Sequence, residues 1–374
     1  MNLIALKQRI KQLALDFGFQ QISVANIDTS DFFPEFKQWV ADGYHADMSY
    51  LERNQHLRQN PEELHPDTCR VISLRYNYLP DSAKFTQVLE DPTRANISRY
   101  ALGRDYHKLI RKKLQKLASS ISELCDDFEY RVFVDSAPVL ETSFANKSGL
   151  GWKGKHTLII NKDAGSWFFL GEIFINLELE IDNPVKNECG KCTSCINLCP
   201  TGAIIAPYKV DARKCISYLT IENQTTIPVE LRAKMGNRIY GCDDCQLACP
   251  WNRFSATTED NAFTARNGLD SASLLSLWLW SEHDFYKKLE GSPIRRIGYQ
   301  NWLRNIAVAL GNGESSPAIL KALADKKSLA NSMVTEHINW AINQLKNRPR
   351  KSSEVSNQTT RLIRTINKMM PRDA

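Results

Sequence analysis

The chain has 374 residues, of which 43% are hydrophobic and 24% charged, and it carries a net charge of +6. These values are typical of a globular protein, and at about 100–200 residues per domain they leave room for two or three domains. No apolar run approaches the roughly 20 residues that a membrane-spanning helix needs. Residues 1–18 read as an amphipathic helix with interspersed basic positions, which is not the pattern of a secretory signal. We therefore expect a cytoplasmic protein without membrane segments.

The positive charge is concentrated in the last third of the chain. From Trp251 onward the sequence has 18 Lys and Arg against 11 Asp and Glu, whereas the preceding residues have 30 against 31. The basic clusters of this region contain Arg295, Arg296, Lys326, Lys327, Arg348, Arg350 and Lys351. This asymmetry favours a polyanionic partner. A solvated basic helix face explains the charge alone equally well.

Residues 1–178 predict a domain built around a sheet. Apolar residues recur at helical spacing over residues 3–17, and a second helix is predicted from His107. Short apolar runs around Val71, Val132 and Ile159 predict strands between the helices. This alternation is typical of an α+β or α/β domain.

A cysteine-rich segment follows, over residues 179–255. Its two runs, CGKCTSCINLCP and GCDDCQLACP, contain Cys189, Cys192, Cys195, Cys199, Cys242, Cys245 and Cys249. The first run is the C-x2-C-x2-C-x3-C-P pattern of bacterial two-cluster ferredoxins. The segment therefore predicts two iron–sulfur clusters and one-electron chemistry.

The ferredoxin pattern also predicts which cysteine binds which cluster. In two-cluster ferredoxins the cysteine before proline crosses to the other cluster. By that rule one cluster is held by Cys189, Cys192, Cys195 and Cys249. The other takes Cys199, Cys242 and Cys245 and lacks one ligand, because Ile239 stands where a ferredoxin has its cysteine. We expect Cys215, in the segment RKCISYL, to be the missing ligand.

Other uses of cysteine fit less well. Four-cysteine zinc sites also use C-x2-C pairs, but they rarely combine a tight triple with Cys-Pro. Disulfides are uncommon in the cytosol, where a cysteine-rich segment more often binds metal. The remaining Cys69 and Cys125 are interpreted as small buried apolar residues.

Residues 256–374 predict a series of short amphipathic helices. They lie within SASLLSLWLWSEHDFYKKL, NWLRNIAVALGN and SPAILKALADKKSLANSMVTEHINWAINQLK, which Gly, Asn and Ser residues interrupt. Paired helices of this length suggest a small solenoid, although two pairs are too few to establish a repeat. A polar stretch, NRPRKSSEVSNQTT, precedes a last predicted helix, RLIRTINKMM.

Several segments, in chain order, resemble one known family. They are YALGRDYHKLIRKKL (100–114), VDSAPVLE (134–141), GLGWKGKHTLII (149–160), GSWFFLGEI (165–173), the cysteine runs with CISYLTIE (215–222), and RNIAVALGN (304–312). Together they span nearly the whole chain. The chain resembles epoxyqueuosine reductase, the cobalamin-dependent iron–sulfur enzyme family of tRNA wobble-base modification.

The resemblance implies an α+β multidomain fold. It implies an α/β cobalamin-binding catalytic domain (1–178), a ferredoxin-like domain with two 4Fe–4S clusters (179–255), and a HEAT-like helical domain that helps to hold tRNA (256–374). Cobalamin would lie between the first two domains with one cluster near its cobalt. The cobalt would be base-off, so His45, His56, His65 and His107 are expected to be surface or hydrogen-bonding residues rather than ligands.

The residue that the resemblance marks as catalytic is Asp135, as a proton donor. Such an acid would protonate the departing epoxide oxygen, and a desolvated pocket would raise its pKa for that purpose. The alternative from the residues alone is that Asp135 only caps the turn after its strand. Further cobalamin or substrate contacts are expected among Arg58, Tyr100, Arg104, Asp135, Ser136, Lys155 and Ser217, each of which has an ordinary surface or hydrogen-bonding role as its alternative.

The function that these expectations define is the reduction of epoxyqueuosine to queuosine in tRNA. A flavodoxin- or ferredoxin-type donor would supply the electrons, and we expect a monomer. One alternative is a cobalamin iron–sulfur reductase of the reductive dehalogenase kind, which acts on a small molecule. A second is a ferredoxin-type electron carrier fused to a scaffold, which the large N-terminal domain with its own motifs disfavours.

Overall fold

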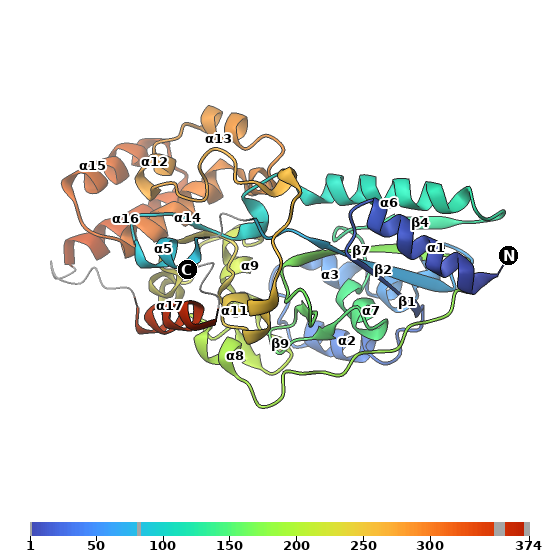
Figure 1. Ribbon diagram of the computed structural model, residues 1–374. Coiled ribbons are helices and arrows are strands. Elements are labelled where there is room, and N and C mark those ends of the chain that lie inside the picture. The colour runs from blue at the N-terminus through green and yellow to red at the C-terminus, as the bar shows by residue number, and fades with distance from the viewer. Residues whose placement is uncertain (1, 81–83, 348–355, 370–374) are drawn as a thin grey trace.

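The computed structural model describes residues 2–80, 84–347 and 356–369, and every statement below refers to these. Figure 1 shows a sheet-containing half and a helical half, with the cysteine-bearing segment between them. Three of the basic residues named above, Arg348, Arg350 and Lys351, lie outside the described residues. Within the described ranges no helix is long and apolar enough to span a bilayer.

The N-terminal domain is built on a four-stranded antiparallel sheet. Its order is β1 (Gln21–Asn26), β2 (Arg70–Asn77), β7 (Phe168–Ile175) and β4 (Tyr130–Phe133). The strands predicted around Val71 and Val132 are β2 and β4. The run around Ile159 instead forms β6 (Ile159–Ile160), which pairs with β5 (Trp152–Lys153) in a separate hairpin.

Helices cover both faces of this sheet. On one face, α1 (Leu3–Asp16) and α6 (Tyr106–Ser122) share a hydrophobic core with the sheet. A Cβ on Gly171 would lie 2.9 Å from Leu114 Cδ1, so glycine lets α6 approach β7 closely. On the other face, α7 (Glu141–Lys147) places Phe144 against Phe174. Residues 173 and 174 therefore serve opposite faces, as strand geometry requires.

The rest of the N-terminal half consists of short elements. They are α2 (Phe33–Ala41), α3 (Ser49–Arg53), α4 (Gln55–Gln59), η1 (Pro61–Glu63), α5 (Phe85–Glu90), β3 (Asn96–Ile97) and η2 (Arg99–Ala101). The two-residue strand β3 leaves the domain and pairs in parallel with β10 (Arg238–Tyr240) of the cysteine-rich segment. A Cβ on Gly241 would lie 2.5 Å from Ser98 Cβ, so the two segments meet at a position that only glycine fits.

The cysteine-rich segment has little regular structure. Besides β10 it contains α8 (Ser194–Leu198), β8 (Ile204–Ala206), β9 (Lys209–Val210), η3 (Ala212–Lys214), α9 (Ile216–Ile221), α10 (Val229–Arg232), η4 (Ala233–Met235), α11 (Asp244–Leu247) and η5 (Pro250–Phe254). A buried ion pair supports the second cysteine run, because Arg238 donates to both oxygens of Asp244 at 2.8 and 2.6 Å. Bidentate pairing fixes both side chains in one orientation.

The C-terminal half is helical, as expected. Its elements are η6 (Asn261–Phe263), α12 (Leu274–Trp278), α13 (Glu282–Lys288), η7 (Pro293–Ile297), α14 (Gly298–Asn312), α15 (Pro317–Lys326), η8 (Lys327–Leu329) and α16 (Ser332–Asn347). The first predicted stretch divides into α12 and α13, because Ser281 and Asp284 form a capping box that begins a new helix. The central helix α14 is buried and packs on α16.

One buried arginine joins this half to the cysteine-rich segment. Arg304 on α14 donates to the carbonyls of Leu219, Asn223 and Thr225 at 2.7–2.8 Å. Burial lowers its pKa to about 10, so it stays charged at neutral pH. A buried cation with three carbonyl acceptors holds the two parts in a fixed relation.

The last helix, α17 (Asn357–Met369), packs away from the other C-terminal helices. It returns to α5, α8 and α11, and it places Leu362, Ile363 and Ile366 in the same hydrophobic core as the sheet. The domain limits at residues 178 and 255 stay a prediction. The β3–β10 pairing and α17 both cross them.

Candidate functional site

The cysteines of the middle segment form two groups. We call Cys189, Cys192, Cys195 and Cys249 the outer group. Burial, together with the charges of the other three thiols, raises the pKa of Cys249 to about 12, so the four lie within electrostatic range of one another. They line a small cavity with Trp251, and Cys192 is exposed at the surface.

We call Cys199, Cys215, Cys242 and Cys245 the inner group. Burial raises the pKa of Cys245, and the charges of Cys215 and Cys199 add to that effect. All four line the main cavity of the molecule. The structure thus brings Cys215 near Cys199, Cys242 and Cys245, although the two cysteine runs do not contain it.

The outer group has a charged neighbour. Lys155 is buried, and its ammonium donates to the carbonyls of Gly190 at 2.7 Å and Cys192 at 2.8 Å. This position indicates that Lys155 holds the outer cysteine loop in place, and it fits that role better than a contact with cobalamin. The next residue, His156, lines the cavities of both groups, and its Nε2 has no hydrogen-bond partner among the described residues. Burial lowers the pKa of His156 to about 4, so its ring is neutral.

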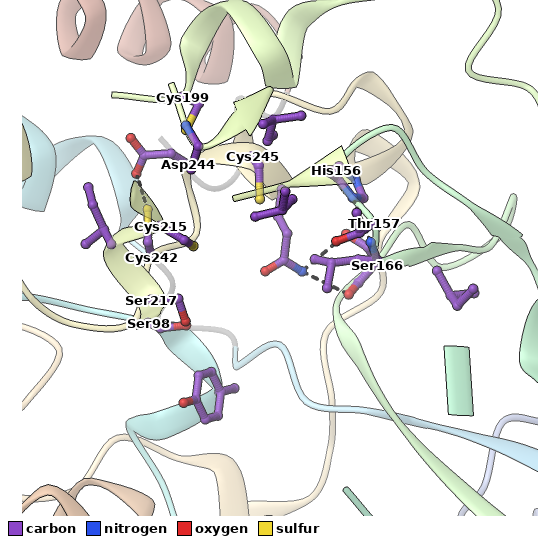
Figure 2. A pocket seen from close by; sticks show the side chains of 18 of the residues that line it. Ser98, His156, Thr157, Ser166, Cys199, Cys215, Ser217, Cys242, Asp244 and Cys245 are labelled. Atoms are coloured by element: carbon purple, nitrogen blue, oxygen red, sulfur yellow. Dashed lines mark hydrogen bonds between the residues drawn. The ribbon is translucent and has the colours of Figure 1, made fainter. Parts of the chain in front are cut away.

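The main cavity lies between the sheet domain and the cysteine-rich segment (Figure 2). Its volume is about 350 Å³, and aromatic rings of Tyr100, Tyr106 and Phe169 form one wall. Side-chain hydroxyls on its lining come from Ser98, Thr142, Thr157, Ser166, Thr201 and Ser217. A second cavity of about 560 Å³ shares Thr142, Thr157, Leu158 and Val210 with it. The two cavities therefore adjoin, and we refer to them together as the cleft.

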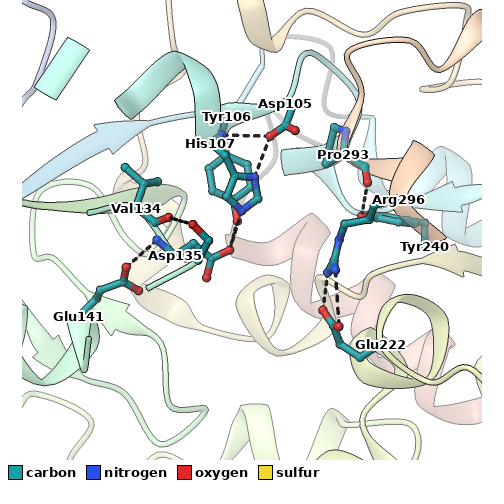
Figure 3. A network of polar contacts seen from close by, with 11 residues as sticks. Asp105, Tyr106, His107, Val134, Asp135, Glu141, Glu222, Tyr240, Pro293 and Arg296 are labelled. Atoms are coloured by element: carbon teal, nitrogen blue, oxygen red, sulfur yellow. Dashed lines mark hydrogen bonds and ion pairs between the residues drawn. The ribbon is translucent and has the colours of Figure 1, made fainter. Parts of the chain in front are cut away.

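A chain of hydrogen bonds lies beside this cavity (Figure 3). Asp105 is the N-cap of α6, and its Oδ1 accepts both the backbone N–H of His107 at 3.0 Å and the ring Nδ1 at 2.7 Å. The cap therefore fixes the imidazole so that Nε2 lies 3.1 Å from Asp135 Oδ2. The hydroxyl of Tyr106 donates a short hydrogen bond to the same oxygen.

Asp135 sits on a turn directly after β4. Its φ is +53°, a left-handed conformation that aspartate tolerates better than most residues. Its backbone N–H donates to Glu141 Oε1 at 2.6 Å. The carboxylate accepts from Tyr106 and His107 instead of capping its own turn, and the side chain keeps 57% exposure. The turn-capping alternative therefore does not describe this residue.

The expected raised pKa of Asp135 is wrong. Enclosure in the cleft raises the pKa of this carboxyl, but the hydrogen bonds from His107 and Tyr106 outweigh it and hold the pKa below its usual range. For His107, burial alone would lower the pKa, but the bonds to Asp105 and Asp135 raise it to about 9. At neutral pH the pair therefore holds its proton on His107.

Two further acids lie behind Asp135. Burial, followed by the charge of Asp135, raises the pKa of Glu141 to about 8. Burial also raises the pKa of Glu172 on β7, and neither of its oxygens has a hydrogen-bond partner among the described residues. Both carboxyls are therefore mostly protonated at neutral pH.

The helical half also reaches the cleft. Arg296 on η7 forms a two-bond ion pair with Glu222 of the cysteine-rich segment (Figure 3). Burial raises the pKa of Tyr240, and the charge of Arg296 opposes that rise and adds to the lowering of the Asp135 pKa, so Arg296 lies within electrostatic range of both.

The remaining expected contacts are dispersed. Tyr100 and Ser217 line the main cavity, and Ser136 adjoins Asp135. Arg58 is buried and donates to the carbonyls of α3, while Arg104 is exposed just before α6. Sequence reasoning did not single out Tyr106, Glu141 and Glu172, it named Arg296 only as part of a basic cluster, and it gave His107 only a surface or hydrogen-bonding role. Of these, Tyr106, His107 and Glu141 lie in the quoted segments YALGRDYHKLI and VDSAPVLE, which was the available signal.

Comparison with known proteins gives two family matches. Residues 58–136 match the model described as epoxyqueuosine reductase QueG, DUF1730. Residues 188–252 match the model described as a 4Fe-4S double cluster binding domain. The second match spans all eight cysteines of the two groups, including Cys215. A match to a 4Fe-4S domain excludes the zinc and disulfide interpretations of these cysteines.

Full-length relatives agree with these matches. The epoxyqueuosine reductase of Escherichia coli is 51% identical over 100% of this chain and 99% of its own, and that of Shewanella oneidensis is 52% identical over 99% and 95%. The solved structure of epoxyqueuosine reductase from Streptococcus thermophilus matches with a TM-score of 0.79 at 25% identity over 97% of this chain and 98% of that one. A crystal structure of epoxyqueuosine reductase with an epoxyqueuosine-modified tRNA stem loop matches with a TM-score of 0.82 at 24% identity over 98% and 100%, and at that identity it shows the fold alone. The chain belongs to the epoxyqueuosine reductase family.

Proposed function

We propose that this protein reduces epoxyqueuosine in tRNA to queuosine. The reaction takes two electrons and two protons, removes the epoxide oxygen as water and leaves an alkene. The observation that carries the proposal is the position of Asp135, an accessible carboxylate bonded to a protonated histidine and to Tyr106, which lines the same cavity as the inner cysteine group. Electron supply and proton supply thus meet in one cleft.

The two cysteine groups fit two 4Fe–4S clusters. All ten cysteines are free thiols, and eight of them form two groups of four. Buried thiols with raised pKa release their protons when iron binds, because the metal supplies the compensating positive charge. We propose that the outer group holds one cluster and the inner group the other.

The cleft fits cobalamin. It combines an aromatic wall with hydroxyls that can pair with the amides of a corrin, and the second cavity extends it for an elongated ligand. The unpartnered Nε2 of His156 faces the same space and fits a polar group bound there. When bound, cobalamin supplies a low-valent cobalt as the electron source. Tyr100 and Ser217 are the expected contacts that the cavity lining supports.

Asp135 and His107 together hold the proton for the departing oxygen. The carboxylate is the more accessible of the two, so it faces the substrate, and His107 recharges it through the 3.1 Å hydrogen bond. Asp105 keeps His107 protonated. Glu141, which is mostly protonated at pH 7, is placed to supply the second proton.

The nucleoside must leave its stack to reach this cleft. Two basic surfaces flank the opening. One is Arg295 and Arg296 on η7. The other is the exposed face of α6 with Lys108, Arg111 and Lys112, none of which forms an ion pair with a described acidic side chain. Lys326 fits a tRNA contact less well, because its ammonium already donates to Trp280 O and the Tyr299 hydroxyl at 2.6 Å.

The relatives that cover the whole chain all carry the epoxyqueuosine reductase name, so a small-molecule dehalogenase is the less supported alternative. We propose further that the protein acts in the cytoplasm as a monomer and receives electrons from a flavodoxin- or ferredoxin-type carrier. Nucleoside analysis of tRNA from cells that lack the protein tests the function. We expect epoxyqueuosine to accumulate and queuosine to disappear, and unchanged queuosine would refute the proposal.

The first prediction concerns Cys215 as the eighth cluster ligand. Cys215→Ala removes one thiolate of the inner group, so the purified protein should contain about half of its iron and sulfide or a degraded inner cluster. Cys125→Ala, a matched change outside both groups, should keep the full content. Full iron and sulfide in Cys215→Ala would show that this ligand assignment is wrong.

The second prediction concerns Asp135. Asp135→Asn keeps the size of the side chain but cannot transfer a proton, so turnover should fall by roughly 10²–10⁴, as is typical for the loss of a general acid. Cluster content, cobalamin binding and thermal stability should be unchanged. Near-normal turnover in this variant would remove Asp135 from the proton path.

The third prediction concerns the pH dependence that His107 imposes. Its pKa is raised to about 9, so the proton of the pair is present below that pH and is lost as pH rises through it. In His107→Gln the remaining proton must reside on Asp135, whose ordinary pKa is about 3.9, so the basic limb of kcat/KM should move from about 9 to lower pH by two units or more. Asp105→Asn should move the limb in the same direction by less, and the exposed His283→Gln should leave it in place. An unmoved limb in His107→Gln would mean that another group holds the proton.

The fourth prediction concerns tRNA binding. Phosphate contacts release counterions, so tRNA affinity should fall steeply with salt. Lys108→Glu with Arg111→Glu, and separately Arg295→Glu with Arg296→Gln, should weaken binding and flatten the salt dependence, while cluster and cobalamin content stay unchanged. Lys321→Glu, on the remote α15, serves as the control for charge alone. If neither pair changed the affinity or the slope, both surfaces would be excluded as the tRNA contact.

A further inference from the structure

We infer that the exposed face of α17 is the docking surface for an acidic one-electron carrier protein that reduces the outer cluster. The inference rests on the proposed function. The α17 surface is separate from the two basic surfaces, on η7 and α6, that we propose for tRNA. The carrier is identified by its chemistry, as a small redox protein with a negatively charged surface around its cofactor.

The position of α17 is the first observation. The helix covers α8 and α11, which carry Cys195 of the outer group and Cys245 of the inner group. Its apolar residues Leu362, Ile363 and Ile366 share a core with Leu198 and Leu247, and Gln358 donates to the carbonyl of Cys199 at 3.4 Å. The helix α17 thus packs directly on the two short helices that carry cysteines of the outer and inner groups.

The charge of α17 is the second observation. Its exposed face carries Arg361, Arg364 and Lys368, and the helix contains no acidic residue. None of the three pairs with an acidic side chain of the described residues. The neighbouring α5 is flanked by one exposed lysine, Lys84, and ends in one exposed glutamate, Glu90, so it adds no net charge.

The accessibility of the two cysteine groups is the third observation. Cys192 is exposed, whereas the inner group lines the cleft in which the substrate reacts. Electrons from outside must therefore enter at the outer group. Next to Cys192 the exposed Lys191 adds another positive charge, and Glu188 in the same loop is paired with Lys186 at 3.8 Å.

The location separates this surface from the tRNA. In Figure 1, α6 lies along the upper side of the molecule, whereas α17, which packs on α5, α8 and α11, lies at its lower edge. A carrier on α17 and a tRNA at the cleft would not compete for one surface. Opposite charge on the carrier would increase its rate of encounter, which falls with ionic strength.

The electron balance is simple. In each encounter the reduced carrier loses one electron and the protein gains one through the outer group. Two encounters supply the two electrons that reduction of one epoxide consumes. Fast exchange between carriers is therefore required, and a surface of three or four charges suits transient binding.

The test compares two triple variants with the same change of charge. The first is Arg361→Glu, Arg364→Glu and Lys368→Glu on α17. The second is Lys108→Glu, Arg111→Glu and Lys112→Glu on α6. Reduced flavodoxin is the probe, and each variant is measured for flavodoxin affinity over a salt series, for the rate of flavodoxin reoxidation, for tRNA affinity, and for turnover with dithionite and methyl viologen.

We expect the α17 variant to bind flavodoxin about tenfold more weakly, with a flattened salt dependence and slower reoxidation. Its tRNA affinity and its dithionite-driven turnover should match the unmodified protein. The α6 variant should show the reverse, with weakened tRNA binding and normal flavodoxin binding.

Three results would overturn the inference. These are unchanged flavodoxin affinity in the α17 variant, a loss of tRNA affinity in that variant, or equal loss of flavodoxin affinity in both variants. If the α17 variant lost iron, the triple Gln variant at the same three positions would be measured instead. We expect an intermediate loss of flavodoxin affinity in it, and an unchanged affinity would contradict docking on α17. Absence of dithionite-driven turnover in the unmodified protein would instead refute the proposed function and leave the binding result standing.

Discussion

The convergence of four thiols from three separate segments is the constraint on which the rest of this structure depends. Cys199, Cys215 and the pair Cys242 and Cys245 come from loops and short helices that cannot fix their own positions. Supports outside the segment do so instead. Arg304 binds three carbonyls around α9, Arg238 orients α11 through Asp244, and β3 pairs with β10. The helical half thus fixes the positions of the cysteine groups, in addition to any part it has in binding a partner.

The same arrangement explains why the proton site lies where it does. The N-cap of α6 and the turn after β4 belong to the sheet domain, whereas the inner cysteines belong to the middle segment. A cleft between two folded parts can present an acid from one side and an electron source from the other. The relative position of the acid and the cysteine groups therefore depends on the interface between the two parts more than on either part alone.

The basic charge of the chain also acquires meaning only from its placement. The excess of positive charge after Trp251 favoured a surface that binds a polyanion, but the basic residues of this region lie in different environments. Arg296 pairs with Glu222, Lys326 bonds to Trp280 and Tyr299, and the cations of α17 face solvent over the cysteine groups. The sheet domain, which is neutral in sum, nevertheless presents a basic face on α6. Net charge per region is a poor guide to where a polyanion binds, because charge acts over distances of about 10 Å and not along the sequence.

The sequence alone determined the chemical class, the cysteine grouping and most helices, because cluster spacing and helical periodicity are local patterns. It also led to Asp135, through a resemblance that the full-length relatives then supported. Tertiary structure decided the rest. The inner strand β7 was not predicted as a strand, because Gly171 and Glu172 interrupt its apolar run and it lacks an alternating pattern. The charge state of Asp135 was predicted wrongly, because its pKa depends on His107 and Tyr106, which lie 28 and 29 residues away in the chain and meet it only in the fold. A pKa is set by neighbours in space, and neither the position of α17 nor the proton held on His107 could be obtained from local sequence.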